Sequence, residues 1–234
     1  MLTCTIDFLQ QLIDLDNRVF LLFNGLHSDY FDALMVMLTG KFIWVPLYIA
    51  MAVALFMSRR AGTALALLIG VGLVIALTDY SISSWIRPYF SRMRPSNTDN
   101  PISALGHVVD DYRGGDYGFP SCHAANSFAL AVFMALVARR RLFTWFIFIW
   151  AVLHSYTRLY LGVHYPGDLI VGVLYGSLVA WLMFMLINAW LAKFASVPAR
   201  NVRDVILVVR PWTWPVMTGV ATVVVSAVVA IFVM

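Results

Sequence analysis

Four side chains of this sequence could together handle a phosphate group. They are His123, Arg158, His164 and Asp168, with two apolar stretches between the first and the rest. A phosphate ester reacts when its nonbridging oxygens are neutralised, a nucleophile is aligned with phosphorus and an acid protonates the departing oxygen. Two histidines, an arginine and a carboxylate are side chains of the required types.

Two further arginines and a helix start could hold the phosphate. Arg87 and Arg94, like Arg158, can each form paired hydrogen bonds with phosphate oxygens. Ser121 and Cys122 come where an apolar helix is predicted to begin, and the free backbone N–H groups of a helix N-terminus bind anions.

His164 and Asp168 are spaced for direct contact. They are separated by Tyr165, Pro166 and Gly167, and a proline fits the first turn of a helix. Residues four apart lie on one side of a helix. Asp168 could therefore fix the tautomer of His164 and stabilise its charge after attack.

The composition indicates that these residues belong to a membrane protein. The chain has 234 residues, of which 62% are hydrophobic and 12% charged, with a mean hydropathy of +0.83. Six uncharged stretches near the length of a membrane span predict an all-α bundle of six transmembrane helices. They are residues 42–57, 63–78, 124–138, 142–157, 169–191 and 214–234.

Basic residues orient the predicted bundle. The linkers after the first, third and fifth spans carry the basic residues Arg59, Arg60, Arg139, Arg140, Arg141, Lys193, Arg200, Arg203 and Arg210. By the positive-inside rule these linkers are cytoplasmic, so segment 87–119 and the turn before Asp168 face the other side. All candidate site residues then share the non-cytoplasmic face.

The first 41 residues are predicted to form an interfacial segment. Phe8, Leu12, Leu15 and Val19 recur at helical spacing among acidic residues, which favours a helix lying on the bilayer surface. We expect one integral-membrane domain over residues 1–234, with a six-helix core at 42–234 and the catalytic motifs at 87–168.

The motifs resemble those of the type 2 phosphatidic acid phosphatase family, membrane relatives of bacterial acid phosphatases and vanadium haloperoxidases. That family has Lys, six residues, then Arg-Pro; here Arg87 stands at the same spacing before Arg94 and Pro95. Its Pro-Ser-Gly-His block is matched by residues 120–123. Its Ser-Arg, five residues, His, three residues, Asp block is matched by residues 157–168.

The resemblance implies a metal-independent, two-step hydrolysis that uses no cofactor. His164 would attack phosphorus to form a phosphohistidine, Asp168 would orient it, and His123 would protonate the leaving group before water releases phosphate. The phosphate-binding residues implied in this way are Arg87, Arg94, Ser121, Cys122 through its backbone N–H, and Arg158.

Three positions depart from the family pattern. Arg87 replaces Lys and Thr157 replaces Ser, which keeps the charge and the hydroxyl. Cys122 replaces Gly, and its Cβ could tilt the backbone around the phosphate. Because the first turn of a helix accepts Cys without a positive φ, we expect activity to be retained.

Several polar residues have simpler interpretations. Arg92 is expected to anchor lipid headgroups at the interface. His27 and His107 have no partner signal and are expected on the surface. His154, one turn before Arg158, fits equally well as a support for the site or as a structural histidine.

We therefore expect a lipid phosphatase of a bacterial inner membrane, with its active site facing the periplasm or cell exterior. Candidate substrates are a polyprenyl diphosphate, a lipid A phosphate, phosphatidylglycerophosphate and phosphatidate. The alternative is a lipid-to-lipid phosphotransferase that uses the same histidines. A transporter is disfavoured because its ionisable groups would lie at mid-span. The expected partners are the lipid substrate and the bilayer, with no nucleic acid; the sequence gives no signal for the oligomeric state.

Overall fold

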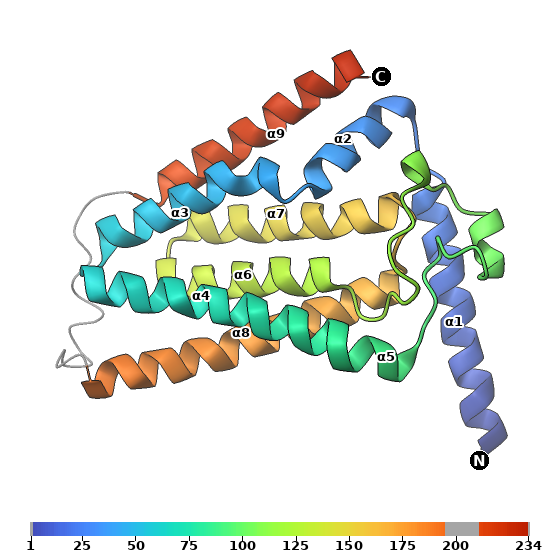
Figure 1. The fold of residues 1–234 in the computed structure, drawn as a ribbon, viewed down its shortest axis with the longest axis horizontal. Helices are drawn as coiled ribbons and strands as arrows, with labels where there is room; N and C mark the ends of the chain where they lie inside the picture. Colours follow the sequence, from blue (N-terminus) through green and yellow to red (C-terminus); the bar gives the residue numbers. More distant parts are fainter. Residues whose placement is uncertain (1, 195–210, 234) are drawn as a thin grey trace.

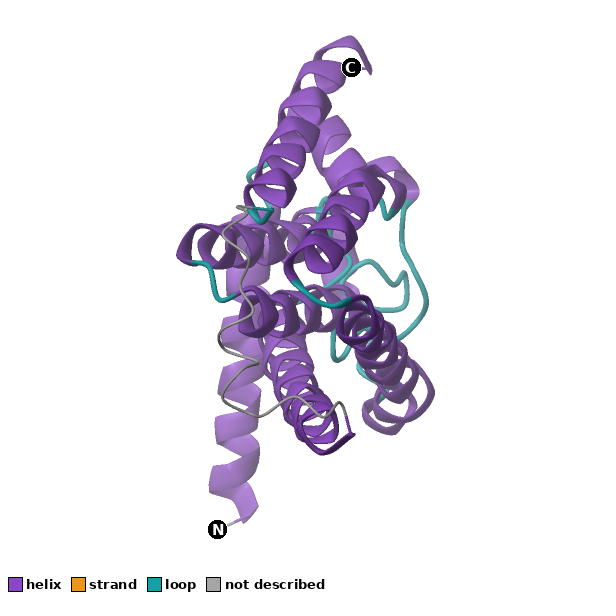
Figure 2. Ribbon diagram, turned by 90° about the vertical axis from the view of Figure 1, so that its left-hand side faces the viewer, coloured by secondary structure: helices purple, strands orange, loops and turns teal. Residues whose placement is uncertain are grey.

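The computed structural model describes residues 2–194 and 211–233, and within these ranges the chain is helical with no strand (Figures 1 and 2). The α-helices are α1 Leu2–Asn24, α2 Asp29–Thr39, α3 Val45–Ser58, α4 Ala61–Ser81, α5 Arg87–Phe90, α6 Cys122–Ala138, α7 Arg141–Tyr160, α8 Pro166–Phe194 and α9 Thr213–Val233. Short helical turns are η1 Phe42–Trp44, η2 Ile82–Ile86, η3 Pro101–Ala104 and η4 Val109–Asp111. The predicted all-α class is confirmed.

The six predicted spans correspond to α3, α4, α6, α7, α8 and α9, but they differ in length. In the described residues four segments are long and apolar enough to cross a membrane, or five if the bent pair Asp29–Thr39 and Phe42–Ser58 forms one span. The helix α6 has only 17 residues. The count of six complete spans is therefore approximate.

The short helix α6 is the centre of the bundle, packed against α4, α7 and α8. The contact with α8 is close because two glycines on α8 face it. A Cβ on Gly172 would lie 2.6 Å from the Ser121 carbonyl oxygen, and one on Gly176 would lie 2.0 Å from that of Ala125. Small residues four apart allow such helix contacts in membranes. This contact places the start of α6 beside the start of α8, where the Ser121 N–H donates to the Asp168 carbonyl at 3.0 Å.

The N-terminal 41 residues do not form one structural unit. The helix α1 crosses one end of the bundle instead of running along it (Figure 1). Phe8, Leu12 and Leu15 on α1 are exposed, which suits the bilayer surface predicted for this helix. By contrast, α2 packs on α7 and α9 and buries Leu34 and Leu38. The predicted boundary at residue 41 therefore does not coincide with a boundary in the fold.

The segment between α5 and α6 is a folded lobe at the same end of the bundle as α1 (Figure 1). Residues 92–94 pair with residues 116–118 through an isolated bridge between Met93 and Tyr117. The Arg94 N–H donates to Asp116 and the Gly118 N–H donates to Arg92, at 3.0 and 2.9 Å. The basic turns after α3 and after α6 lie at the opposite end, while Arg200, Arg203 and Arg210 fall outside the described residues.

Candidate active site

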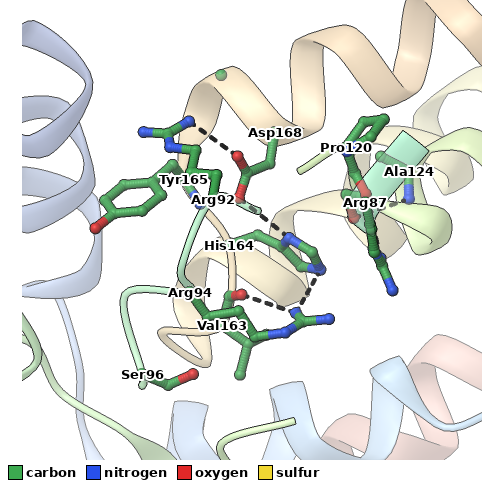
Figure 3. A network of polar contacts seen from close by, with 12 residues as sticks. Arg87, Arg92, Arg94, Ser96, Pro120, Ala124, Val163, His164, Tyr165 and Asp168 are labelled. Atoms are coloured by element: carbon green, nitrogen blue, oxygen red, sulfur yellow. Dashed lines mark hydrogen bonds and ion pairs between the residues drawn. The ribbon is translucent and has the colours of Figure 1, made fainter. Parts of the chain in front are cut away.

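His164 and Asp168 form a buried pair where α7 turns into α8. The His164 Nδ1 lies 3.3 Å from Asp168 Oδ2, and the two side chains are 1% and 0% exposed. Asp168 Oδ2 also accepts the Tyr165 N–H at 3.0 Å. The helical spacing of the motif thus produces the contact expected from the sequence (Figure 3).

Arg94 determines the tautomer of His164. Its Nη1 lies 2.8 Å from His164 Nε2 and also donates to the Val163 carbonyl at 3.0 Å. A guanidinium can only donate hydrogen bonds, so Nε2 must accept. The ring proton of neutral His164 is then on Nδ1, directed at Asp168, and the Nε2 lone pair is directed at Arg94.

The second oxygen of Asp168 is held by a residue that was expected elsewhere. Arg92 Nη1 lies 2.9 Å from Asp168 Oδ1, and Arg92 Nη2 lies 2.7 Å from Asp16 Oδ2 on α1. The Arg92 guanidinium also covers the Tyr165 ring at 4.1 Å. The expectation that Arg92 anchors lipid headgroups is therefore wrong, because both ends of its guanidinium are paired with carboxylates.

Asp16 extends this network to the N-terminal helix. Its Oδ1 accepts the Gly167 N–H at 2.8 Å, and a Cβ on Gly167 would lie 2.8 Å from Asp16 Oδ2. The contacts run from α1 through Arg92 to Asp168 and His164, so one chain of charge-assisted hydrogen bonds holds the His164–Asp168 pair. No local sequence signal connects Asp16 with Asp168, which is 152 residues away in the numbering.

The three predicted phosphate-binding arginines converge on one cavity. Arg87 donates from Nε and Nη2 to the Pro120 carbonyl at 3.2 Å. Arg158 donates to Thr39 Oγ1 at 2.7 Å and to the Tyr112 hydroxyl at 3.3 Å. Like Arg94, it lines the cavity.

Within the described part of the chain, two of these arginines have donors that no protein atom satisfies. The Nε atoms of Arg94 and Arg158 are buried without a hydrogen-bond partner. Burial, with the repelling charges of Arg87 and Arg158, lowers the pKa of Arg94 to about 10, so the side chain stays charged at neutral pH. A buried cation with an unpaired donor raises the free energy of the folded state. An anion bound between the arginines would accept these hydrogen bonds and offset that cost.

The block at the start of α6 forms the other side of the cavity. Ser121 is the N-cap, and its Oγ accepts the Ala124 N–H at 3.4 Å. Cys122 is the first residue of α6, and its φ is not positive, as expected for the first turn of a helix. The rings of His123 and His154 stack at 5.7 Å, and His154 Nδ1 lies 2.8 Å from Ser127 Oγ.

The structure thus brings the eight predicted site residues together in two layers. Six of them line the cavity: Arg87, Arg94, Cys122, His123, Arg158 and His164. Asp168 and Ser121 are both fully buried and lie behind the six residues that line the cavity.

Gly118 is a further site residue that the motifs do not include. A Cβ at this position would lie 3.0 Å from Asp168 Oδ2 and 3.4 Å from His164 Nδ1. A side chain at position 118 would therefore require Asp168, His164 or the lobe itself to shift. A glycine in a loop gives little indication of this role from sequence alone.

Burial also keeps the nucleophile uncharged. Desolvation, followed by the positive charges of Arg94 and Arg158, holds the pKa of His164 well below its usual value of 6.5. Protonation of Nε2 would remove the lone pair that a nucleophilic role requires. The environment therefore favours the reactive form at neutral and mildly acidic pH.

The cavity has a volume of about 820 Å³ and continues from the arginines into an apolar sleeve. The sleeve is lined by Met51 and Leu55 of α3, Leu68 and Val71 of α4, and Leu130 and Met134 of α6. Lining residues on the successive helical segments α4, η2 and α5 extend from Leu68 to Arg87, which corresponds to about 28 Å at the helical rise per residue. A molecule with a phosphate at one end and a hydrocarbon tail at the other would match both parts.

The chain belongs to the PAP2 superfamily, which it matches over residues 63–192. It is 44% identical over 185 residues to a lipid A 4'-phosphatase of Bacteroides thetaiotaomicron, covering 79% of this chain and 82% of that protein. It is 32% identical to a lipid A 4'-phosphatase of Porphyromonas gingivalis, covering 82% and 81%. An undecaprenyl-diphosphatase of Sulfolobus acidocaldarius is 31% identical, with coverage of 75% and 79%.

Solved structures have the same fold. A transmembrane PAP2-type phosphatidylglycerolphosphate phosphatase from Bacillus subtilis aligns with a TM-score of 0.55 and 19% identity, covering 79% of this chain and 88% of that one. Aquifex aeolicus LpxE aligns with a TM-score of 0.50 and 23% identity, covering 72% and 93%. The family and the fold together support a membrane lipid phosphatase, as the motifs implied.

Proposed function

We propose that this protein removes a phosphate from a lipid of the lipid A type in two steps, through a phosphohistidine on His164. One observation carries the proposal. The His164 Nε2 lone pair faces a cluster of arginines, while Nδ1 is held by Asp168, at the polar part of a cavity that continues into an apolar sleeve. This arrangement suits attack on a phosphate whose lipid tail lies in the sleeve.

In the first step, a bond forms between His164 Nε2 and phosphorus and the bond from phosphorus to the lipid oxygen breaks. Arg94 must leave Nε2, and a phosphate oxygen offers its guanidinium a stronger, charge-assisted partner. Asp168 stabilises the positive ring through Nδ1–H. The negative charge of the bound phosphate favours the protonated form of His123, which then gives its proton to the departing lipid oxygen.

In the second step, water attacks phosphorus and the bond to Nε2 breaks. His123, now neutral, accepts the proton of that water. The products are inorganic phosphate and the regenerated His164. No metal enters either step, because three arginines neutralise the phosphate oxygens.

Lipid A is the substrate class favoured by the relatives. Two proteins named lipid A 4'-phosphatase match more than three quarters of this chain at 44% and 32% identity. A polyprenyl diphosphate is the second candidate, because an undecaprenyl-diphosphatase matches at 31%. Both present a terminal phosphate and long hydrocarbon tails.

We place the active site on the non-cytoplasmic side. The basic turns after α3 and α6 lie at the opposite end of the bundle from the lobe, and clustered arginines favour the cytoplasm. A membrane-impermeant maleimide should label Asp99→Cys, in the exposed part of the lobe, from outside intact cells or spheroplasts. It should not label Arg140→Cys at the other end, and the reverse pattern would invert the orientation.

The substrate test uses purified protein in detergent with EDTA. Lipid A, undecaprenyl diphosphate, phosphatidate and phosphatidylglycerophosphate are each supplied, and free phosphate and lipid products are measured by colorimetry and mass spectrometry. We expect phosphate release from lipid A, lost in His164→Ala and kept in His27→Ala, an exposed histidine outside the cavity. Transfer of phosphate to another lipid without free phosphate would indicate a phosphotransferase instead.

A further inference from the structure

A second cluster of ionisable residues lies outside the cavity, where the lobe meets the turn between α1 and α2. The ligand atoms of His27, Asp32 and His107 all lie within 4.8 Å of one another. His107 Nε2 is 2.8 Å from Asp32 Oδ2, and the rings of His27 and His107 are parallel with centroids 3.8 Å apart. His27 is exposed, as expected, and His107 is half-buried, but both histidines have partners that the sequence did not indicate.

The three residues differ in accessibility in a way that suits ion entry. His27 is exposed, and the side chains of His107 and Asp32 are 29% and 18% exposed. An ion could therefore reach the cluster from solvent without an opening of the fold.

Two of the three residues are held in place by neighbours that do not compete for the ion. Asp32 Oδ1 accepts the Tyr160 hydroxyl at 2.6 Å, which leaves Oδ2 directed at His107. Such outer hydrogen bonds orient the carboxylates and imidazoles of metal sites.

The backbone of His107 is fixed as well. Its N–H donates to Asn24 Oδ1 at 2.6 Å, and its carbonyl accepts from Asn24 Nδ2 at 2.8 Å. Asn24 is buried, with 1% exposure, and also donates to the Tyr160 carbonyl. Gly162, at φ +75°, allows this approach because a Cβ there would lie 2.5 Å from the His107 carbonyl oxygen.

We propose that His27, Asp32 and His107 form a binding site for a divalent transition-metal ion, with Zn²⁺ as the best match. Zn²⁺ accepts two imidazole nitrogens and one carboxylate oxygen, and water can take the fourth position. Ca²⁺ and Mg²⁺ prefer sites built from oxygen ligands, so they fit this set poorly.

Binding requires a defined movement. An ion must lie in the plane of each imidazole ring that coordinates it, and two stacked rings cannot both meet that condition. The exposed His27 ring therefore turns out of the stack, while His107 and Asp32 separate slightly to admit the ion between Nε2 and Oδ2.

The site is structural and is separate from the phosphate chemistry. It joins the α1–α2 turn to the lobe that carries Arg92, Arg94 and Gly118. A bound ion would connect these segments and stabilise the lobe against local opening. Activity measured with EDTA is expected to persist, because the ion contacts none of the reacting atoms.

The test is a Zn²⁺ titration of the full chain in detergent after removal of metals. Isothermal calorimetry should give one equivalent of Zn²⁺, the unfolding temperature should rise with Zn²⁺ but not with Mg²⁺, and Co²⁺ should give the visible absorption of a four-coordinate ion. His27→Ala and His107→Ala should each weaken Zn²⁺ binding by at least about tenfold.

His27→Ala is the decisive variant, because its side chain is exposed and its loss should not disturb folding. Tyr160→Phe, which removes the hydrogen bond to Asp32, should weaken binding less than either histidine variant. Asp29→Asn, an exposed acid on the same helix as Asp32, is the matched control and should bind normally. Absence of stoichiometric binding, or binding unchanged in both His27→Ala and His107→Ala, would overturn the proposal.

Discussion

The two histidines that we propose as nucleophile and acid lie in very different surroundings. His164 is 1% exposed and has both ring nitrogens in hydrogen bonds, with Asp168 on one side and Arg94 on the other. The structure records no hydrogen bond for the His123 ring among the described residues; it stacks on His154 and faces the cavity.

This difference suits the two roles that we propose for them. The nucleophile forms a bond to phosphorus, so its tautomer and direction must be fixed before the substrate arrives. The acid must follow the leaving oxygen and then meet a water molecule, so it needs access to the cavity more than it needs a rigid partner. The proposed site thus combines a nucleophile, His164, whose ring is held by two hydrogen bonds, with an acid, His123, whose ring faces the cavity.

Loss of the Asp168 charge should lower kcat more than any other change proposed here, because Asp168 holds the ring of His164. Asp168→Asn changes the hydrogen bond that fixes the Nδ1–H tautomer of His164, and kcat should fall by about 10⁴-fold. The loss should be equal for a lipid phosphate and for p-nitrophenyl phosphate, because both need the nucleophile. Asp99→Asn in the exposed lobe should leave kcat unchanged. A loss below tenfold would show that the carboxylate does not act on the nucleophile.

Removal of the acid should separate the two substrates. His123→Ala should lower kcat for a lipid phosphate by about 10²- to 10⁴-fold, because the alkoxide then leaves without a proton. p-Nitrophenolate is a good leaving group and needs no proton, so its release in the first step should be affected much less in burst measurements. An equal loss of the burst rate for both substrates would contradict the assigned role.

Arg92 and Asp16, which hold Asp168 in place, should contribute less to kcat than Asp168 itself. Arg92→Gln removes one charged hydrogen bond to Asp168 and should lower kcat by about 10- to 100-fold with little change in KM. Arg92→Lys should recover part of the loss. Asp16→Asn, which acts only through Arg92 and Gly167, should cost less than about fivefold. Arg113→Gln, in the same lobe but paired with exposed Asp111, is the control. A rise in KM at constant kcat would instead place Arg92 in substrate binding.

A methyl group on Gly118 should disturb the catalytic pair by contact alone. The new Cβ would press on Asp168 Oδ2 and His164 Nδ1, and kcat should fall by about tenfold, the effect of a crowding cost of 1–2 kcal/mol. Gly115→Ala is the matched control, because a Cβ there meets no atom within 4 Å. Equal activities of the two variants would remove Gly118 from the site.

The pH at which His164 is protonated is expected to give the smallest effect, but it reports on this residue alone. Because its pKa is held well below 6.5, the ring should stay neutral, with the proton on Nδ1, as the pH falls through 6.5. Nitrogen-15 NMR of histidine-labelled protein can follow this, with His164→Asn to assign the signal among five histidines. A protonation midpoint at or above 6.5 would mean that burial and the nearby arginines do not act on the ring as inferred.

The sequence predicted the contact between His164 and Asp168 better than it predicted the residues that hold this pair in place. His164 and Asp168 are four residues apart, so helical geometry alone predicts their contact. The apolar stretches likewise predicted the helices, since hydrophobic runs of this length form few other structures. Contacts such as Asp16 with Arg92 join an N-terminal helix to a folded lobe, and neither partner has a local pattern that identifies the other.

The lobe was the hardest part to predict. Its bridge between Met93 and Tyr117, the closeness of Gly118 to the catalytic pair and the cluster around His107 all depend on tertiary packing. Its polarity and its prolines and glycines predict a loop, but they do not predict the shape of that loop. The helix α2 was missed for a similar reason, because it is short and bent relative to α3.

The most direct test of the account is to trap the covalent intermediate. Wild-type protein is mixed with a ³²P-labelled lipid phosphate, quenched within milliseconds in base, which preserves phosphohistidine, and digested for mass spectrometry. We predict acid-labile label on the peptide that contains His164, with none in His164→Ala. Label on another residue, or rapid turnover with no labelled protein at any time, would contradict a phosphohistidine at His164.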